Sequence, residues 1–173
     1  ALAQMGRIDI LVNNAGTNIP QPIDEVRDED WDRVMETNLN SIMVLTRALV
    51  PQMKARRWGR IIHISSVMGF ISKEGRNAYS ATKSALLGLA RASALELGSH
   101  GITVNCIAPG LFMTELPARL LSEKDKQDLI AGTAVHRWGD PRELVGPVLL
   151  LASEAGSYIT GSTLVVDGGW LAR

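Results

Sequence analysis

A serine, a tyrosine and a lysine near the middle of the chain have the types and spacing of a proton-transfer site. Tyr79 and Lys83 are four residues apart in a segment of helical pattern, so they share one face, one turn apart. Ser66 stands just after a predicted strand. A tyrosine with a pKa of about 10 is a poor base near neutral pH, but a cation one turn away lowers that pKa. We therefore expect Tyr79 to exchange a proton with an alcohol or carbonyl oxygen that Ser66 also hydrogen-bonds.

Each of these residues also has an ordinary structural interpretation. A helical tyrosine is more often packing, its lysine is usually a solvated charge, and Ser65 and Ser66 could simply end a strand. A hydrolase that uses Ser66 with His63 or His136 is a further alternative. We do not favour it, because the sequence lacks the Gly-x-Ser-x-Gly motif and His63 falls inside a predicted strand. No clustered histidines, cysteines and carboxylates suggest a metal site.

Four short apolar runs predict the sheet that positions these residues. The runs are nearly continuous in Ile, Leu and Val, a pattern typical of parallel strands covered on both faces. We expect the strands at Ile8–Val12, Arg60–Ser65, Thr103–Ala108 and Ser162–Val166. In such sheets ligands bind beyond the carboxyl ends of the strands, which is where Ser66 stands.

Segments of helical period alternate with these strands and predict a single α/β domain over residues 1–173 with right-handed crossovers. The residues before Gly6 have the pattern of the last turn of a helix. The expected helices are Trp31–Leu49 with Asp28 as its cap, Ala85–Leu97 ended by Gly98, and a shorter one after Asp140-Pro141. The mixed segment from Leu111 to Trp138 is interpreted as a helical insertion or a mobile lid.

Composition excludes several kinds of partner. The chain has 18 basic and 18 acidic side chains, and this balance does not indicate a nucleic acid or an anionic membrane as a partner. No apolar run approaches membrane-spanning length. Cys106 is the only cysteine and lies in an apolar run, so we expect a buried, reduced thiol and, from it, a cytoplasmic protein.

Several short motifs follow one another in a fixed order. Asn13-Asn14-Ala15-Gly16 follows the first strand, Asn38 lies in the first long helix, and Ser66 precedes Tyr79 and Lys83. Pro109-Gly110 and Thr114 follow the third strand, and Asp167-Gly168-Gly169 closes the last. This ordered set resembles the classical short-chain dehydrogenase/reductase family from Asp9 to Gly169. The resemblance implies a Rossmann-like doubly wound parallel sheet and hydride transfer between NAD or NADP and a small-molecule carbonyl or secondary alcohol.

The resemblance also implies a role for each motif. Tyr79 is the general acid/base, Lys83 lowers its pKa and binds the nicotinamide ribose, and Ser66 positions the substrate oxygen. Asn38 holds a water that links Lys83 to solvent, although a mid-helix asparagine taken alone is expected to be exposed. Asn13 ties adjacent strands together. The implied cofactor contacts are Asn13, Asn14, Ala15, Gly16, Tyr79, Lys83, Pro109, Gly110, the backbone of Phe112, and Thr114. For Asp167-Gly168-Gly169 we favour a structural turn.

The sequence departs from the family pattern at its start. The family opens with a strand and a glycine-rich turn, yet neither Gly-x-x-x-Gly-x-Gly nor Gly-x-Gly-x-x-Gly occurs here. We expect the catalytic, C-terminal part of a longer protein, without about 70–80 residues if one βαβ unit takes about 30. The sheet would then be truncated to strands 4-5-6-7, with Ile8–Val12 as an unpaired edge. Dinucleotide binding by this piece would be weak, and the choice between NAD and NADP cannot be read.

Partners follow from the same resemblance. Family members usually assemble through the two long helices that carry Asn38 and Tyr79, so a homodimer or homotetramer is expected. A truncated, non-catalytic piece that acts only through self-association is the alternative. Apolar residues in segments 68–74 and 111–136 should bound the substrate pocket. Sugar acids, β-ketoacyl thioesters, steroids and small ketones all remain open as substrates.

Overall fold

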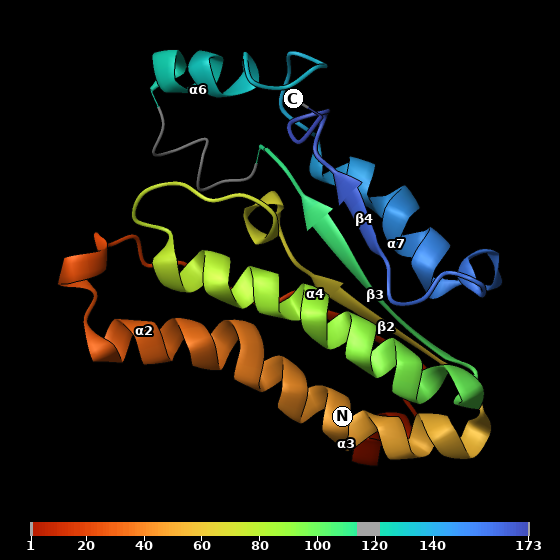
Figure 1. Ribbon diagram of the computed structural model, residues 1–173. Helices are drawn as coiled ribbons and strands as arrows, with labels where there is room; N and C mark the ends of the chain where they lie inside the picture. Colours follow the sequence, from red (N-terminus) through yellow and green to blue (C-terminus); the bar gives the residue numbers. More distant parts are fainter. Residues whose placement is uncertain (1, 114–121, 173) are drawn as a thin grey trace.

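The computed structural model describes residues 2–113 and 122–172, and these form three layers around one sheet (Figure 1). Four parallel strands lie side by side in chain order: β1 (Ile10–Asn13), β2 (Gly59–Ile64), β3 (Ile102–Pro109) and β4 (Thr163–Val166). The four predicted strands are confirmed with small shifts of their ends. The predicted α/β class with a parallel, Rossmann-like sheet is also confirmed.

Helices cover both faces of the sheet (Figure 1). On one face lie α3 (Ser41–Arg56) and α4 (Asn77–Leu97), preceded by α2 (Asp28–Met35), and on the other lies α7 (Val145–Ala152). Helix α6 (Glu123–Ile130) lies beyond the carboxyl ends of β3 and β4, and α1 (Leu2–Met5) ends at Gly6 in the left-handed conformation, φ 71°. Short 3-10 turns occupy η1 (Ile23–Glu25), η3 (Val67–Gly69), η4 (Gly98–His100), η5 (Pro141–Leu144) and η6 (Glu154–Gly156).

The core has two parts because strand side chains point alternately to the two faces of the sheet. Ile61 packs with α3 and α4, whereas Ile62, the next residue, packs with Leu151 of α7. Cys106 belongs to the first part and is a buried, free thiol, as predicted. Coverage on both faces explains why the strand sequences are apolar throughout rather than alternating.

Strand β1 forms one edge of the sheet. Within the described part of the chain it pairs only with β2, in a parallel register that sets Leu11 beside Ile61. Ile10 and Val12 are 43% and 40% exposed. The predicted apolar edge at this strand is therefore present.

Three helix details differ from the predictions. Asp28 is not the cap: α2 begins at Asp28 after Arg27, and the acidic first turn instead complements the helix dipole. The predicted continuous helix is interrupted by a π-turn, η2 (Glu36–Asn40), where the Ser41 N–H bonds to the Glu36 carbonyl. Helix α4 does end before Gly98, but Gly98 is right-handed and the left-handed residue is Gly101, after η4.

The helical segment expected after Asp140-Pro141 is present, and Asp140 caps it. Its carboxylate accepts from the Arg142 N–H, in a capping box with Glu143, and Pro141 opens the 3-10 turn that leads into α7. The predicted insertion between Leu111 and Trp138 contains one helix, α6, in the described residues, and positions 114–121 lie outside them.

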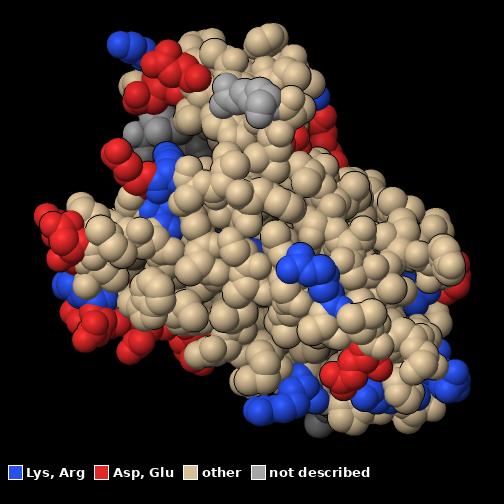
Figure 2. Space-filling view, in the orientation of Figure 1, with Lys and Arg blue, Asp and Glu red and all other residues tan. Residues whose placement is uncertain are grey.

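Charged side chains are unevenly distributed on the face seen in Figure 2. Acidic side chains gather over α2, whereas most of the central surface is uncharged apart from a basic side chain near the middle of the view. Exposed apolar residues on α3 include Met43, Val44 and Leu45. In the parts of the chain that the structure describes, no helix combines the length and apolar character needed to cross a bilayer.

Candidate active site

Lys83 is buried rather than solvated. Only 3% of its surface is exposed, and its Nζ donates a 2.7 Å hydrogen bond to the carbonyl of Ile64, the last residue of β2. The ammonium also lies 5.5 Å from the centre of the Tyr79 ring. Burial disfavours the charged form and lowers the pKa of Lys83 to about 8. The ordinary interpretation of this lysine as a surface charge is therefore wrong.

Two serines connect the end of β2 to α4. Ser65 Oγ donates to the Lys83 carbonyl at 2.8 Å. Ser66 caps η3, where its Oγ accepts from the Met68 N–H at 3.1 Å. A Cβ on Gly69 would lie only 3.0 Å from the Lys83 carbonyl oxygen, so a glycine is needed where η3 meets α4. This close approach brings Ser66 to Tyr79.

The pKa of Tyr79 is raised, not lowered as the sequence suggested. Burial of the phenol is the largest cause, and a hydrogen bond from Ser66 and the charge of Arg76 act in the opposite direction. Lys83 is not among these causes; its ammonium is bonded to the Ile64 carbonyl. At neutral pH Tyr79 therefore holds its proton in this structure.

Asn38 is completely buried, so its interpretation as an exposed helix residue is wrong. Its Oδ1 accepts from the Thr17 N–H at 2.7 Å, and its Nδ2 donates to the Thr17 carbonyl at 2.8 Å. The π-turn widens the helix at this point and delivers the amide to the loop that follows β1. Asn38 thus joins η2 to the loop that follows β1 (residues 14–17), called the motif loop below.

Thr82 connects Asn38 to the tyrosine helix and was not identified from the sequence. Its Oγ1 accepts from Asn38 Nδ2 at 3.1 Å and donates to the Tyr79 carbonyl at 2.8 Å. The side chain is fully buried. A threonine three residues after a tyrosine on a helix was the available signal, because its hydroxyl can reach a carbonyl of the preceding turn.

Asn13 ties adjacent strands together, as expected. Its Nδ2 lies 3.0 Å from Nδ1 of His63 on β2. His63 is fully buried, and burial lowers its pKa to about 4, so the ring is neutral at physiological pH. His136 lies on an exposed loop, and no described hydrogen bond joins either histidine to Ser66. The arrangement does not support a serine hydrolase.

The rest of the motif loop lies against the buried polar groups. Asn14, Ala15 and Gly16 are exposed. A Cβ on Gly16 would be 3.4 Å from Lys83 Nζ and 3.6 Å from Asn38 Oδ1. The sheet thus brings together residues that are nearly 70 positions apart in the sequence. An exposed loop backed by a buried cation suits a polar ligand such as a ribose.

The third strand supplies the other side of the site. Pro109 ends β3, and Gly110 N–H donates to the Val166 carbonyl at 2.9 Å. A Cβ on Gly110 would lie 2.7 Å from the Asp167 backbone, which explains the glycine. Phe112 packs its ring on Gly139. Thr114 lies outside the described residues.

Asp167 has a structural role in this arrangement. Its two carboxylate oxygens accept 2.8 Å hydrogen bonds from the N–H groups of Gly169 and Leu171. Gly168 and Gly169 both have positive φ, 63° and 82°, which favours glycine. The preferred interpretation of this motif as a turn is confirmed.

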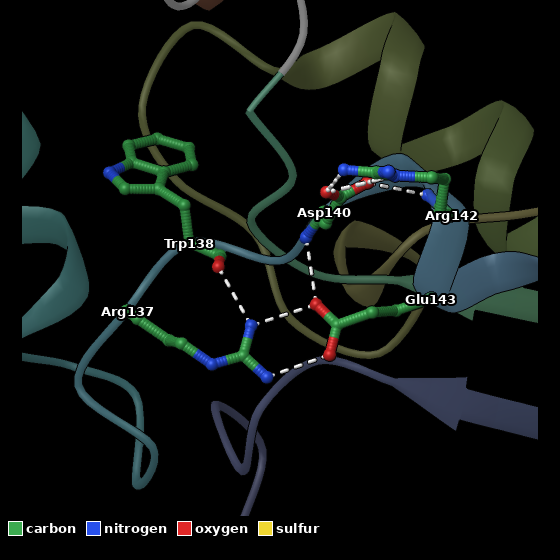
Figure 3. Close-up of polar contacts among 5 residues, drawn as sticks. All are labelled: Arg137, Trp138, Asp140, Arg142 and Glu143. Carbon is green, nitrogen blue, oxygen red and sulfur yellow. Dashed lines mark hydrogen bonds and ion pairs between the residues drawn. The ribbon is translucent and has the colours of Figure 1, made fainter.

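The two ends of the segment between β3 and α7 are joined by backbone hydrogen bonds. Met113 N–H donates to the Gly139 carbonyl at 3.0 Å, and Gly139 N–H donates to the Leu111 carbonyl at 2.9 Å. Next to this contact, Arg137 forms a two-pronged ion pair with Glu143, each bond 2.7 Å long (Figure 3). Arg137 holds the pKa of the Glu143 carboxyl at about 2. A cavity of about 80 Å³ lies here, lined by Leu111, Phe112, Val135, Arg137, Gly139, Glu143, Val166, Asp167 and Gly168.

A parallel sheet with helices on both faces, and a tyrosine, lysine and serine at the carboxyl end of its central strand, define a Rossmann-like oxidoreductase class. Comparison with known proteins agrees: the family model described as enoyl-(acyl carrier protein) reductase matches residues 1–171. The chain belongs to the classical short-chain dehydrogenase/reductase family.

Individual relatives differ in substrate. Gluconate 5-dehydrogenase of Gluconobacter oxydans is 40% identical over 166 residues, which cover 95% of this chain and 65% of the relative. The 3-oxoacyl-(acyl-carrier-protein) reductase of Escherichia coli is 41% identical over 167 residues, 96% of this chain and 68% of the relative. The chain thus spans about two thirds of the length of these relatives.

A solved structure shows the same fold. A gluconate 5-dehydrogenase from Burkholderia cenocepacia, in complex with NADP and tartrate, superposes with a TM-score of 0.95 and 37% identity. The superposition covers 99% of this chain and 68% of that one.

Proposed function

We propose that this chain carries the catalytic residues of an NAD(P)-dependent oxidoreductase that interconverts a carbonyl group and a secondary alcohol. The observation that carries the proposal is the gathering of Ser66, Tyr79 and Lys83 at the carboxyl end of β2, with Asn38 behind them. Family membership and dehydrogenase or reductase relatives support the reaction class.

The chain's own residues would move the proton. Ser66 would hold the substrate oxygen next to Tyr79, and Tyr79 would donate its phenolic proton to that oxygen as the carbonyl double bond opens. A bound nicotinamide supplies the hydride to the carbonyl carbon in this direction and accepts it in the other. Because burial raises the pKa of Tyr79, the protonated form needed for carbonyl reduction is the one present at neutral pH.

Lys83 and Asn38 would support this step. Lys83, with its pKa of about 8, can supply the proton that restores the Tyr79 phenol after it has donated its own. Both amide hydrogens of Asn38 are already used by Thr17 and Thr82. A water could therefore reach Asn38 only by donating to one of its carbonyl oxygens, and we assign the Asn38 side chain a positioning role.

The residues at the site fit a dinucleotide. Asn14, Ala15 and Gly16 would lie along its adenosine side, Lys83 and Tyr79 at the nicotinamide ribose, and Pro109, Gly110 and Phe112 at the nicotinamide ring. The closeness of Gly16 to Lys83 Nζ supports this assignment, because a side chain there would fill the space. NADP in the Burkholderia structure supports a nicotinamide cofactor, and the choice between NAD and NADP stays open.

The proposal is tested by assaying the purified 173-residue chain with both reduced cofactors and a panel of small oxo compounds. Turnover that Tyr79→Phe removes and Tyr158→Phe leaves intact supports the assignment; these are the only two tyrosines. Equal activity of the two variants would contradict it. Cofactor titration is run beside the assay, because submicromolar binding would refute the expectation of weak dinucleotide affinity.

A chain that acts only by self-association is the second candidate. The exposed apolar edge at Ile10 and Val12 and the exposed Met43, Val44 and Leu45 of α3 favour it. Sedimentation or size-exclusion mass, measured on the wild type and on Leu45→Glu, separates the two ideas. A protein that assembles and binds cofactor but is inactive supports the candidate that acts only by self-association. An active protein supports the oxidoreductase, whether it is a dimer, a tetramer or a monomer.

A further inference from the structure

Arg76 occupies a position from which it can reach the reacting end of the site. It is the N-cap residue of α4, Tyr79 lies three residues further on in the first turn of that helix, and the charge of Arg76 acts on the Tyr79 hydroxyl. The backbone around it is fixed: Gln21 N–H donates to the Gly75 carbonyl at 3.1 Å, and Asn77 Nδ2 donates to the Gln21 carbonyl at 3.0 Å. The backbone of Arg76 also forms an isolated parallel β-bridge with Gln21.

The guanidinium of Arg76 has no acidic partner in the described part of the chain. Other arginines on nearby loops are paired, Arg27 with Asp30 and Arg137 with Glu143. Arg76 is nevertheless half-buried. Its guanidinium is therefore available to pair with an anion from outside the chain.

The charge of Arg76 acts on the Tyr79 hydroxyl. It lowers the pKa of that group, whereas Lys73, three residues earlier on the same exposed segment, does not contribute. Effects of this kind require a short separation. Basic side chains are visible between α6 and the start of α4 in Figure 2.

On the basis of the oxidoreductase function above, we propose that Arg76 binds a carboxylate of the substrate, which is therefore a small hydroxy or oxo acid. A guanidinium matches a carboxylate with two parallel hydrogen bonds. Because Arg76 lies next to Tyr79, the carboxylate has to lie only a few carbons from the carbon that reacts. A long acyl thioester carries no charge at that distance from its ketone, so sugar acids fit and 3-oxoacyl chains do not.

The test uses a matched pair of probes, D-gluconate and D-sorbitol, which differ in having a carboxylate or a hydroxymethyl group at one end. Binding to the 173-residue chain is measured by calorimetry with and without NADP, and turnover is measured separately. The variants are Arg76→Gln, Arg76→Lys and, as a matched control from the same loop, Lys73→Gln. A titration of the Tyr79 phenol in a Tyr158→Phe background checks that each variant keeps the site.

We expect gluconate to bind better than sorbitol, and Arg76→Gln to weaken gluconate at least tenfold while leaving sorbitol unchanged. Lys73→Gln should have no effect, and Arg76→Lys should recover only part of the loss. In Arg76→Gln the pKa of Tyr79 should rise further. Gluconate binding that is absent in the wild type, or equal in the wild type and Arg76→Gln, overturns the proposal. Selective gluconate binding without turnover supports carboxylate binding by Arg76 and counts against the oxidoreductase proposal. Turnover that Arg76→Gln leaves unchanged supports the oxidoreductase proposal and counts against carboxylate binding by Arg76.

Discussion

Two polar clusters hold the two sides of the candidate site, and they are built differently. Around Asn38, the bonds join neutral groups: the side chains of Asn38 and Thr82 are fully buried, and the backbone of Thr17, to which Asn38 also bonds, is half-buried. At the base of the segment after β3, exposed ion pairs join Arg137 to Glu143 and Arg142 to Asp140 (Figure 3). Water can replace the exposed bonds of the second cluster more readily than those of the first, because Asn38 and Thr82 are fully buried. The difference indicates that the tyrosine side is rigid and the loop side is adjustable.

The largest expected effect is on chemistry at the rigid side. Tyr79→Phe removes the proton donor and should lower turnover at least about a hundredfold, the usual scale for a positioned acid/base. In the wild type, carbonyl reduction should fall as the pH rises through the raised pKa of Tyr79, because the protonated form is the one required. Steady-state rates between pH 6 and 11 measure both effects. A pH profile that Tyr79→Phe leaves unchanged removes the tyrosine from this role.

Thr82→Val breaks the buried cluster itself. It leaves Asn38 Nδ2 and the Tyr79 carbonyl each without one partner, at a cost of about 1–3 kcal/mol in the free energy of unfolding. Misplacement of Tyr79 should reduce kcat by about tenfold with little change in the KM for cofactor. Denaturant melts and steady-state kinetics test this. Thr82→Ser, which keeps the hydroxyl, should restore most of kcat; equal losses in both variants would mean that the hydroxyl is not the cause.

Substitution of Lys83 tests whether the buried ammonium stabilises or destabilises the folded protein. The pKa falls from 10.5 to about 8 in the folded protein, so below pH 8 burial of the ammonium costs about 3 kcal/mol. This cost disappears between pH 8 and 10.5, where the unfolded chain binds more protons than the folded one. Lys83→Met also loses the bond to Ile64, so a net gain of about 1–2 kcal/mol is expected at pH 7. Chemical melts from pH 7 to 10.5 should show that gain shrinking; a constant difference contradicts the argument.

The smallest effect is expected on the adjustable side. Glu143→Gln removes an exposed ion pair, so the melting temperature should change less than in Thr82→Val, and the change should fade with added salt. The Glu143 carboxyl has a folded pKa of about 2, so its contribution is present above the usual glutamate pKa and is lost as the pH falls toward 2. Thermal melts at low and high salt measure it, with Glu25→Gln as control, since Glu25 forms no ion pair with the residues that the structure describes. A fall in melting temperature that does not depend on salt and equals that of Thr82→Val would show that the two clusters do not differ in their contribution to stability.

The strands and the position of Ser66 could be predicted because a strand buried on both faces leaves a clear apolar run, as around Ile61 and Ile62. The surroundings of Asn38 could not, because a π-turn leaves the helical period of the sequence nearly unchanged while it redirects one side chain. The pKa of Tyr79 was predicted in the wrong direction because spacing places Lys83 one turn away but does not reveal that its ammonium bonds to Ile64. Thr82 was missed because its bond to Asn38 joins residues 44 positions apart, which the spacing of the motifs does not report.

The pair formed by Asn13 and His63 has a consequence for handling the protein in acid. An N–H of Asn13 faces Nδ1, so the ring accepts there and carries its proton on Nε2. Protonation of the buried ring is resisted down to about pH 4, whereas an unfolded histidine takes up a proton near pH 6.5. Stability is therefore lost as the pH falls from 6.5 toward 4. An acidic elution step during purification would thus weaken the sheet at the end where the candidate site lies.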